Sequence, residues 1–586
     1  MIYKIVIEPR AVLDIQDAID YYESKQNGLG QYFYQVVEEH IETLAKNPFF
    51  QIRYKDYHGF PIWKFPFIVL YYIDEKLETI YIMSVFNTYL NPVNIQNKHT
   101  MSQEIRNLEP KALWNKFADL NAVPRPSKKE ERVIEFMKNF GNSLGLETFE
   151  DEIRNVIIRK PATSGMENRK PIVLQGHLDM VHQKNADTVF DFDKQGIDMY
   201  VDGDWVRARG TTLGADNGLG VAMIMAILES KTIKHPAIEA LFTIDEETGM
   251  TGALNLKGGI LKGEILLNMD TEEDDEIDIG CAGGIDVTAT RSYQEEETPE
   301  DSVGYTITVK GLNGGHSGMD IHKGLGNANK IMNRLLFDAF ENFGLQVSEI
   351  NGGSLRNAIP RESVAKVIVA GMYDEAYVFD MQEIINDIKT EYKTTEPNLT
   401  IEIVKCDLPK KVMDLGVQEG ILRSIYAAHN GVYRMSADME DLVETSNNIA
   451  RVIIKDGEIT ISCLTRSSVE TSKFDLANAL RSAFELCGCE VNLTGSYPGW
   501  TPNVKSEILD LLVKIYEKQN NEKPKVVACH AGLECGILGT NYPDMDMISF
   551  GPTIQGAHSP DERASIQSSQ KFWKFVLEIL ENIPVK

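Results

Sequence analysis

Residues 169–179, RKPIVLQGHLD, and residues 210–230, GTTLGADNGLGVAMIMAILES, decide the fold of the central part of this chain. The first stretch is a short apolar run typical of a buried strand, and it ends in polar residues. The second begins with a glycine-rich turn and continues as a long apolar helix. Two more short apolar runs follow as predicted strands, at 239–245 (EALFTID) and 263–270 (GEILLNMD). Strands that alternate with helices indicate an α/β fold, in which helices pack on a mostly parallel sheet.

Residues with metal-binding side chains lie at the ends of these and later apolar segments: His177, Asp216, Glu247, Asp270 and His558. Imidazole and carboxylate groups without thiolates suit a divalent zinc, manganese or cobalt ion in a hydrolytic site. Ligand sites gather at the carboxyl ends of parallel strands, and three of these five side chains fit that rule from the sequence alone. One aspartate between two histidine–carboxylate pairs is also the bridge that two metal ions about 3.5–4 Å apart require.

Asp179 and Asp216 occupy positions that could assist metal binding. Side chains two residues apart on a strand point to the same side, so Asp179 can hydrogen-bond the second ring nitrogen of His177 and fix its tautomer. A histidine–aspartate pair inside an ordinary core is the alternative. Asp216 stands at the start of the apolar helix, where Gly210 and Gly214 give the backbone freedom to turn the carboxylate inward. The alternative for Asp216 is a helix N-cap.

Two adjacent carboxylates, Glu246 and Glu247, close the apolar run at 239–245. Neighbouring side chains cannot easily share one direction, so the pair predicts two different roles. One carboxylate can bind metal while the other holds the attacking water and transfers its proton, as general base and then general acid. Acidic pairs are also common at strand ends on protein surfaces, which is the alternative. The acidic stretch at 271–276 is expected to be a solvated loop.

The overall composition, with a formal net charge of −28, excludes several classes of protein. A chain with this acidic surplus is not a general nucleic-acid binder, because it lacks the basic groups that neutralise phosphates. We find no apolar run of the roughly 18 residues that a membrane span needs, and no signal-peptide pattern at the N-terminus. The seven cysteines include Cys487-Gly-Cys489, but one C-x-C pair is poor zinc spacing. Free thiols in a reducing cytoplasm are therefore expected.

Changes of pattern along the chain predict four segments: a small α+β domain, the first part of a metal-binding domain, an inserted α/β lid domain, and the second part of the metal-binding domain. In that order they cover residues 1–98, 101–284, 285–490 and 491–586. In the first segment we expect strands at 2–8, 61–74 and 78–86 and helices at 11–25 and 30–46. Residues 91–100 are polar without a hydrophobic period, so they are predicted to be a linker.

Long motifs distributed over the last three segments carry a family resemblance. They are VLQGHLDMVHQK (173–184), GTTLGADNGLGVA (210–222), TIDEETGMTGA (243–253), GLNGGHSGMDIH (311–322), GGSLRNAIPRE (352–362) and CHAGLECG (529–536). Through them, residues 101–586 resemble the aminoacyl-histidine dipeptidases, the PepD-type or Xaa-His dipeptidases of the two-zinc exopeptidase superfamily. The resemblance extends over nearly the whole of that region.

The resemblance implies two divalent metal ions, with zinc expected first and manganese or cobalt as alternatives. It implies that one ion is held by His177 and Asp270 and the other by Glu247 and His558, with Asp216 as the bridge. It further implies that Asp179 orients the imidazole of His177 and that Glu246 is the general base. None of the five ligand positions departs from the family pattern.

The resemblance also implies substrate contacts outside the ligand set. His316, in the Gly-Gly-His-Ser-Gly turn at 314–318, would be the lid histidine that helps to polarise the scissile carbonyl. Asn357, Arg466 and Gly532 match positions that bind the backbone or the carboxylate of the substrate. The alternative for Arg466 is a surface cation, and the alternative for the other two is an ordinary turn residue.

The implied activity is hydrolysis of the peptide bond of dipeptides, Xaa-His dipeptides among them, through a metal-activated water. A related deacylase or aminoacylase is the alternative within the same chemistry, because metal ligands do not identify the acyl group. A metal-binding scaffold without catalysis is disfavoured, since binding alone requires neither Glu246 nor Asp179. The partners expected are dipeptide substrates, and the strands of the insertion leave a homodimer open.

Two stretches near the N-terminus, LAKNPFFQIRYKD (44–56) and FPFIVLYYIDEKLETIYIMSVF (65–86), make residues 1–96 similar to RelE/ParE-type toxins of toxin–antitoxin modules. Where many such toxins have a histidine and an arginine after the last strand, this chain has FNTYLNP. Residues 1–98 also carry nine Lys/Arg against twelve Asp/Glu, which disfavours cleavage of mRNA. A retained fold that binds an antitoxin-like partner peptide, or that binds nothing, is the alternative, and Met101 suggests a fusion of two reading frames.

Overall fold

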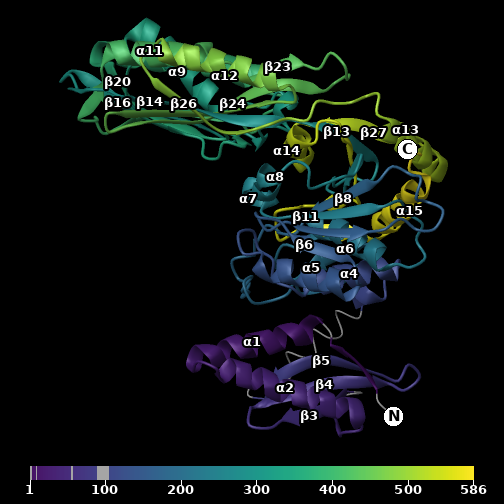
Figure 1. Cartoon of the computed structure of the whole chain (residues 1–586). Helices are drawn as coiled ribbons and strands as arrows, with labels where there is room; N and C mark the ends of the chain where they lie inside the picture. Colours follow the sequence, from purple (N-terminus) through teal and green to yellow (C-terminus); the bar gives the residue numbers. More distant parts are fainter. Residues whose placement is uncertain (1–2, 8, 55–56, 89–103) are drawn as a thin grey trace. The chain divides into compact units, whose positions relative to one another are not determined.

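The computed structural model describes residues 3–7, 9–54, 57–88 and 104–586. Within it the chain divides into two compact units, each formed by segments that are distant in the sequence (Figure 1). Unit 1 comprises Met1–Glu276, Asp510–Pro524 and Ser549–Lys586, and unit 2 comprises Ile277–Leu509 and Lys525–Ile548. Among the described helices, none is long and apolar enough to cross a lipid bilayer.

The N-terminal part of unit 1 is a five-stranded sheet with two helices. Its elements are β1 (Lys4–Ile7), α1 (Pro9–Lys25), α2 (Leu29–Lys46), β2 (Ile52–Tyr54), β3 (Tyr57–Ile62), β4 (Phe67–Asp74) and β5 (Thr79–Asn87). The strand order is β1-β5-β4-β3-β2, with β1 parallel to β5 and the other neighbours antiparallel. Apolar side chains of α2, such as Phe33 and Val37, share one core with Val69 and Ile82 of the sheet.

Most of the elements predicted for this part are present. The two helices are confirmed, and the last two predicted strands pair as an antiparallel hairpin. The single strand predicted at 61–74 is wrong, because β3 ends at Ile62 and β4 begins at Phe67. Lys64 lies between them with a φ of 73°, in the left-handed region that turns a chain. The predicted linker at 91–100 and Met101 lie outside the described residues.

The rest of unit 1 is built around three parallel strands. Its elements are α4 (Lys111–Asn121), α5 (Glu131–Ser143), β6 (Glu147–Glu150), β7 (Val156–Lys160), β8 (Ile172–His177), β9 (Met199–Asp202), β10 (Trp205–Ala208), α6 (Ala215–Glu229), β11 (Ile238–Thr243), α7 (Glu246–Gly249), α8 (Thr251–Asn255), β12 (Ile265–Asn268), α13 (Glu507–Asn520), β29 (Ile554–Gln555), β30 (Arg563–Ser565) and α15 (Ile566–Asn582). Strand β8 is parallel to both β11 and β12, whereas β7 and β6 continue the sheet antiparallel. The sheet is therefore mixed, and the predicted parallel arrangement is confirmed for its three central strands.

Those three strands are buried along their whole length. Full burial is typical of parallel strands that are covered on both faces, and it explains why their sequences are continuous apolar runs. Helix α6 contacts β8 and α4, and its residues are buried from Ala215 to Leu228. A four-stranded sheet has the order β29-β30-β10-β9. In it, β30 from the C-terminal part of the chain pairs with β10, which precedes α6.

Unit 2 is dominated by a nine-stranded antiparallel sheet (Figure 1). Its order is β21-β16-β20-β18-β24-β25-β14-β26, and β23 pairs with β24. These strands are β14 (Gly283–Ser292), β16 (Ser302–Lys310), β18 (Gln346–Gly352), β20 (Ser363–Ala370), β21 (Thr400–Cys406), β23 (Gly431–Met435), β24 (Val443–Lys455), β25 (Glu458–Ser467) and β26 (Glu490–Tyr497). The predicted segment boundary at residue 490 falls at the start of β26, which pairs with β14, so residues 491–497 belong to this sheet.

Helices cover one face of this sheet, where α9, α11 and α12 lie side by side (Figure 1). The helices of unit 2 are α9 (Ala328–Phe343), α10 (Asp374–Tyr392), α11 (Leu415–Ala427), α12 (Glu470–Glu485) and α14 (Glu534–Asn541). Its other elements are β13 (Glu276–Cys281), β15 (Glu295–Glu297), β17 (Gly315–His316), β19 (Ala358–Ile359), β22 (Lys411–Met413), β27 (Lys525–Cys529), β28 (Asp546–Ser549) and the 3₁₀ turns at Ile321–Lys323 and Gly371–Tyr373. Helices and sheet share one large apolar core.

Candidate functional site

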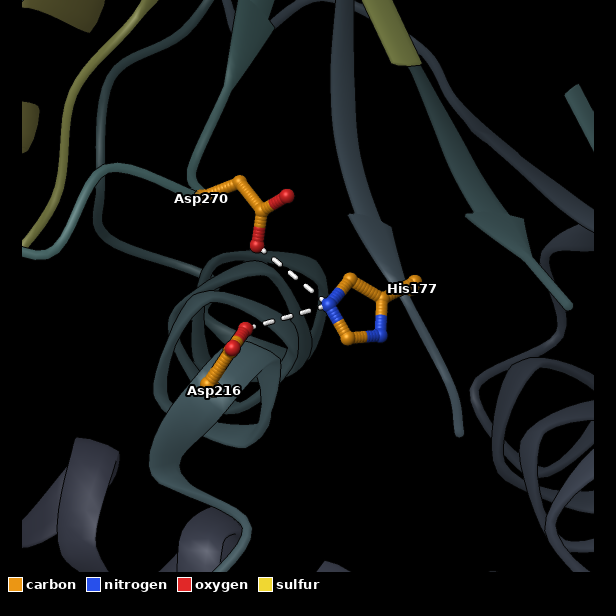
Figure 2. A group of neighbouring side chains, drawn as sticks. All are labelled: His177, Asp216 and Asp270. Atoms are coloured by element: carbon orange, nitrogen blue, oxygen red, sulfur yellow. Dashed lines mark hydrogen bonds and ion pairs between the residues drawn. The ribbon is translucent and has the colours of Figure 1, made fainter. Parts of the chain in front are cut away.

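Three of the predicted ligands meet at the carboxyl end of the parallel strands of unit 1. His177 is the last residue of β8, Asp216 is the second residue of α6, and Asp270 follows the end of β12. The Nε2 atom of His177 lies 3.1 Å from Oδ1 of Asp216 and 3.4 Å from Oδ1 of Asp270. Figure 2 shows both carboxylates pointing toward this one ring nitrogen. All three side chains are nearly inaccessible to solvent.

A second group forms around the other oxygen of Asp216. The Nε2 atom of His558 lies 3.2 Å from Oδ2 of Asp216 and 2.9 Å from Oε2 of Glu247. His558 stands in the loop between β29 and β30 with a left-handed φ of 63°. Glu247 was expected to close a strand, but β11 ends at Thr243 and Glu247 lies in the short helix α7. The turn between them directs its carboxylate toward His558.

Asp216 is the residue that both groups share, since each of its two oxygens faces a different histidine. Gly214 occupies the N-cap position of α6 with a φ of 68°, so Asp216 is not the N-cap. Asp216 itself has the non-helical angles φ −79° and ψ 115°, and the peptide bond to Asn217 is cis. The glycine-rich turn thus places the carboxylate of Asp216 at the start of α6, between His177 and His558.

The arrangement of charges in both groups fits divalent cations. In each group the three ligand atoms lie within 4.8 Å of one another. A single N–H cannot donate a straight hydrogen bond to two oxygens at once, whereas a cation between them attracts all three donor atoms. Burial, followed by the charge of Asp216, raises the pKa of Glu247, and burial also raises that of Asp270. Crowded carboxylates that resist ionisation are stabilised by a positive ion among them.

Asp179 connects the first group to the short helix α7. Its carboxylate lies 3.4 Å from Nδ1 of His177 and accepts hydrogen bonds from the backbone N–H groups of Glu246, at 3.0 Å, and Glu247, at 3.3 Å. The side chain is completely buried. Burial opposes ionisation, but the contact with His177 and the donated hydrogen bonds lower the pKa of Asp179. One carboxylate therefore holds the backbone of both glutamates and lies beside the ring of His177, and its role in orienting that ring stays a prediction.

Glu246 is not among the residues of either ligand group, whereas Glu247 belongs to the second group and its side chain is 2% exposed. As whole residues, both glutamates are partly exposed. The two different roles of the adjacent carboxylates stay a prediction. The acidic stretch after Asp270 is less solvated than expected, because Thr271 is 7% exposed and Asp274 forms an ion pair with Lys571 at 2.8 Å.

Glu562 holds the turn beside the candidate ligands, and the sequence analysis missed it. It is 2% exposed, and its carboxylate accepts hydrogen bonds from four consecutive backbone N–H groups. The donors are Leu213 at 2.7 Å, Gly214 at 2.9 Å, Ala215 at 2.7 Å and Asp216 at 3.3 Å. Glu562 therefore ties the loop that carries His558 to the turn that positions Asp216. The signal that could have identified it is its place in the stretch QGAHSPDE (555–562), four residues after His558.

Arg125 also binds this turn, and the sequence analysis missed it. Its guanidinium donates to the carbonyls of Leu178 at 3.1 Å and Asp179 at 2.9 Å, and to the carbonyl of Gly214 at 2.5 Å. The residue is 1% exposed. Burial lowers its pKa to about 10, and the charge of Glu562 is the largest influence in the other direction. Arg125 thus links the segment after β8 to the turn before α6.

The predicted substrate residues lie in unit 2, and two of them are neighbours. Nδ1 of His316 accepts hydrogen bonds from the backbone N–H groups of Gly318, at 3.2 Å, and Met319, at 3.0 Å. These donors favour the tautomer with its proton on Nε2. Arg466 on β25 is 4% exposed, so it is not a surface cation, and its Nη2 lies 3.5 Å from Nε2 of His316. Its Nη1 donates to the hydroxyl of Tyr497 at 3.0 Å, which adds a residue that the sequence analysis missed.

The other two predicted substrate residues occupy turns. Asn357 is exposed between β18 and β19, and its carbonyl accepts a hydrogen bond from Ser317, next to His316, at 2.8 Å. Gly532 lies between β27 and α14. As whole residues, Asn357 is exposed and Gly532 is partly exposed.

Comparison with known proteins agrees with this geometry. Residues 173–582 match the family model described as peptidase family M20/M25/M40. The chain is 43% identical over 487 residues to the cytosol non-specific dipeptidase of Escherichia coli (strain K12), a match that covers 82% of this chain and 100% of that protein. It is also 43% identical to the crystal structure of aminoacylhistidine dipeptidase from Vibrio alginolyticus, with a TM-score of 0.77 and coverage of 82% of this chain and 99% of that one. The chain therefore belongs to peptidase family M20/M25/M40.

Proposed function

We propose that this protein is a cytoplasmic dipeptidase that uses two divalent metal ions, with zinc as the first choice. The observation that carries the proposal is the carboxylate of Asp216, whose two oxygens face two separate histidine–carboxylate groups. In this proposal His177 and Asp270 hold one ion, and Glu247 and His558 hold the other. The names of the two relatives, a non-specific dipeptidase and an aminoacylhistidine dipeptidase, support dipeptides as the substrate class and Xaa-His among them.

Two bound cations of this kind lower the pKa of a water molecule toward about 7 and polarise a substrate carbonyl. The protein supplies the proton transfer. Glu246 accepts the proton of the attacking water on its carboxylate and delivers it to the nitrogen of the leaving amine. Asp179 keeps Glu246 in place through the hydrogen bond that it accepts from the Glu246 backbone at 3.0 Å.

Two further residues that the family resemblance points to take part in the proposed mechanism. His316 donates from Nε2 to the oxyanion that develops on the scissile carbonyl, because its Nδ1 already accepts two backbone hydrogen bonds. Arg466 binds the terminal carboxylate of the dipeptide, with Tyr497 holding one of its guanidinium nitrogens. Asn357 and Gly532 are proposed to bind the substrate backbone. A homodimer and an antitoxin-like peptide at residues 1–98 stay predictions.

The test is hydrolysis by the metal-stripped chain before and after zinc or manganese is restored. The panel contains several Xaa-His dipeptides, other dipeptides, a tripeptide and an N-acetyl amino acid. We expect metal-dependent cleavage of the dipeptides and no cleavage of the tripeptide. Cleavage of the acetylated substrate alone would replace this proposal with a deacylase, and no cleavage by metal-loaded protein would contradict both.

Arg466→Lys should raise KM for dipeptides by about 10–100-fold, because lysine loses the paired hydrogen bonds of a guanidinium to a carboxylate. The dipeptide amide, which has no terminal carboxylate, should show little change in KM. Arg451→Lys on β24 is the matched control, since Arg451 is exposed. An equal rise in KM for the dipeptide and its amide would show that Arg466 does not bind the carboxylate.

A further inference from the structure

Two cysteines of unit 2, Cys487 and Cys489, lie in the turn that ends α12. Their Sγ atoms are 3.6 Å apart. Gly488 between them has a φ of 80°, the left-handed conformation that commonly ends helices. Because the chain folds back there, the backbone N–H groups of both cysteines donate to the carbonyl of Phe484, at 3.2 and 3.1 Å. The helix end therefore holds the two thiols against each other.

The two thiols differ in their access to solvent. Cys489 is 6% exposed and belongs to the apolar core of unit 2. Cys487 is partly exposed, and the residue before it, Leu486, is 90% exposed. A small reagent can therefore reach Cys487 first, with Cys489 directly behind it. This is the arrangement of a reactive thiol next to a resolving thiol.

The surroundings of Cys487 act in both directions. As a thiol, Cys487 donates a hydrogen bond to the carbonyl of Phe484 at 3.0 Å, whereas its other neighbours favour the thiolate. The hydrogen bond from the Cys489 thiol is the largest influence, and together with Ser424 and Arg291 it outweighs burial and lowers the pKa of Cys487 to about 6. The same contact raises the pKa of Cys489. Arg291 also donates a hydrogen bond to the carbonyl of Cys487, which keeps its positive charge beside the turn. The thiolate is the form that acts as a nucleophile.

We propose that Cys487 and Cys489 form a thiol–disulfide exchange site for low-molecular-weight disulfides. The Sγ atom of Cys487 attacks one sulfur of the small disulfide, forms a new S–S bond and releases the other half as a thiolate. Cys489 then loses its proton and attacks Sγ of Cys487, which releases the second half and forms the Cys487–Cys489 disulfide. The protein gives up two protons and two electrons, and the small disulfide becomes two thiols.

The exchange should be reversible, because a disulfide that closes over a single residue constrains the unfolded chain very little. Disulfides that add little stability are readily reduced by small thiols. All the residues named for this site lie in unit 2, and none of them is among the proposed metal ligands. The proposal is therefore independent of the proposed peptidase function, and either can fail without the other.

The test treats the full-length protein with bis(2-hydroxyethyl) disulfide at pH 7, then alkylates the remaining thiols and maps the peptides by mass spectrometry. We expect the peptide with Cys487 and Cys489 to escape alkylation and to lack its two thiol hydrogens. Reduction with dithiothreitol should restore alkylation at both positions. Cys406, a partly exposed thiol of the same unit, is the internal reference. Cys487 should react about 10-fold faster than Cys406 at pH 7, because the lowered pKa of Cys487 increases its own thiolate fraction.

Two variants separate the roles of the thiols. Cys489→Ser should keep a stable mixed disulfide on Cys487, because no resolving thiol remains. Cys487→Ser should leave Cys489 almost unmodified, since Cys489 is buried. A mixed disulfide that persists on Cys487 in the unsubstituted protein would overturn the proposal. So would a Cys487 that reacts no faster than Cys406.

Discussion

Replacing Glu246 with glutamine is expected to lower kcat for dipeptides by about 10²–10⁴-fold, the usual contribution of a positioned general acid–base group. The amide has nearly the same size as the carboxylate but cannot accept the proton of the attacking water. Glu246 is not among the residues of either ligand group, so the metal content should match that of the unsubstituted protein. The measurement is kcat and KM for one good dipeptide, with metal content determined on the same samples.

Glu247→Gln is the matched control, because the two glutamates are adjacent and their backbone N–H groups donate to the same carboxylate of Asp179. The Glu247 side chain is 2% exposed and lies 2.9 Å from Nε2 of His558. This substitution should weaken metal binding by more than the roughly 10–100-fold typical of residues that only support a ligand. Its activity should recover in part when metal is added in excess.

The two variants are therefore expected to differ in metal content and turnover. Glu246→Gln keeps metal and loses turnover, whereas Glu247→Gln loses metal first. If Glu246→Gln loses metal to the same degree as Glu247→Gln, the two roles have been assigned wrongly. If Glu246→Gln retains metal and full turnover, another residue accepts the proton.

The sequence predicted the framework of unit 1 well because its strands are continuous apolar runs. The run at 172–177 is β8, and it ends at His177 as expected. The glycine-rich turn before Asp216 was also recognisable, since Gly210 and Gly214 both have positive φ. Strand ends were less accurate where polar residues follow an apolar run, because the chain leaves β11 at Thr243, before the two glutamates. Periodicity alone does not say where a strand stops.

The residues that hold the ligands in place could not be predicted from local sequence. The hydrogen bond from Leu213 to Glu562 joins residues 349 positions apart, and that from Arg125 to Gly214 joins residues 89 positions apart. Both side chains bind backbone groups, and a backbone group carries no residue type that a sequence pattern could match. The pairing of β26 with β14 was missed for a similar reason, because the strands are far apart in the chain.

Replacing Glu562 with alanine is expected to destabilise unit 1 by about 3–5 kcal/mol, the range for removing one partner of a buried charged contact. The substitution would leave four backbone N–H donors of residues 213–216 without their acceptor. Each unsatisfied buried donor costs about 1–3 kcal/mol, less whatever water recovers. Asp216 belongs to the freed turn, so metal binding should weaken as well, by about 10–100-fold.

The measurement is the melting temperature of the metal-free and the metal-loaded protein, beside metal affinity by competition with a chelating dye. The metal-free form reports the effect on folding alone. Glu562→Gln is the milder variant, because the amide oxygen can still accept hydrogen bonds from the backbone. The amide NH2 group cannot accept them, so part of the contact is still lost. Glu581→Gln is the control, since Glu581 is a half-exposed carboxylate that pairs with Lys234 on the surface. That control should change stability by no more than about 0.5 kcal/mol.

The two readouts distinguish a residue that only stabilises the fold from one that also positions Asp216. A residue that only stabilises would lower both melting temperatures equally and leave the affinity of the folded protein unchanged. The carboxylate of Glu562 accepts hydrogen bonds from the N–H of Asp216 itself, at 3.3 Å, and from those of the three residues before it. We therefore expect the substitution to lower the melting temperature of the metal-loaded protein more than that of the metal-free protein. An unchanged affinity in folded Glu562→Gln would show that α6 and Arg125 hold Asp216 in place without Glu562.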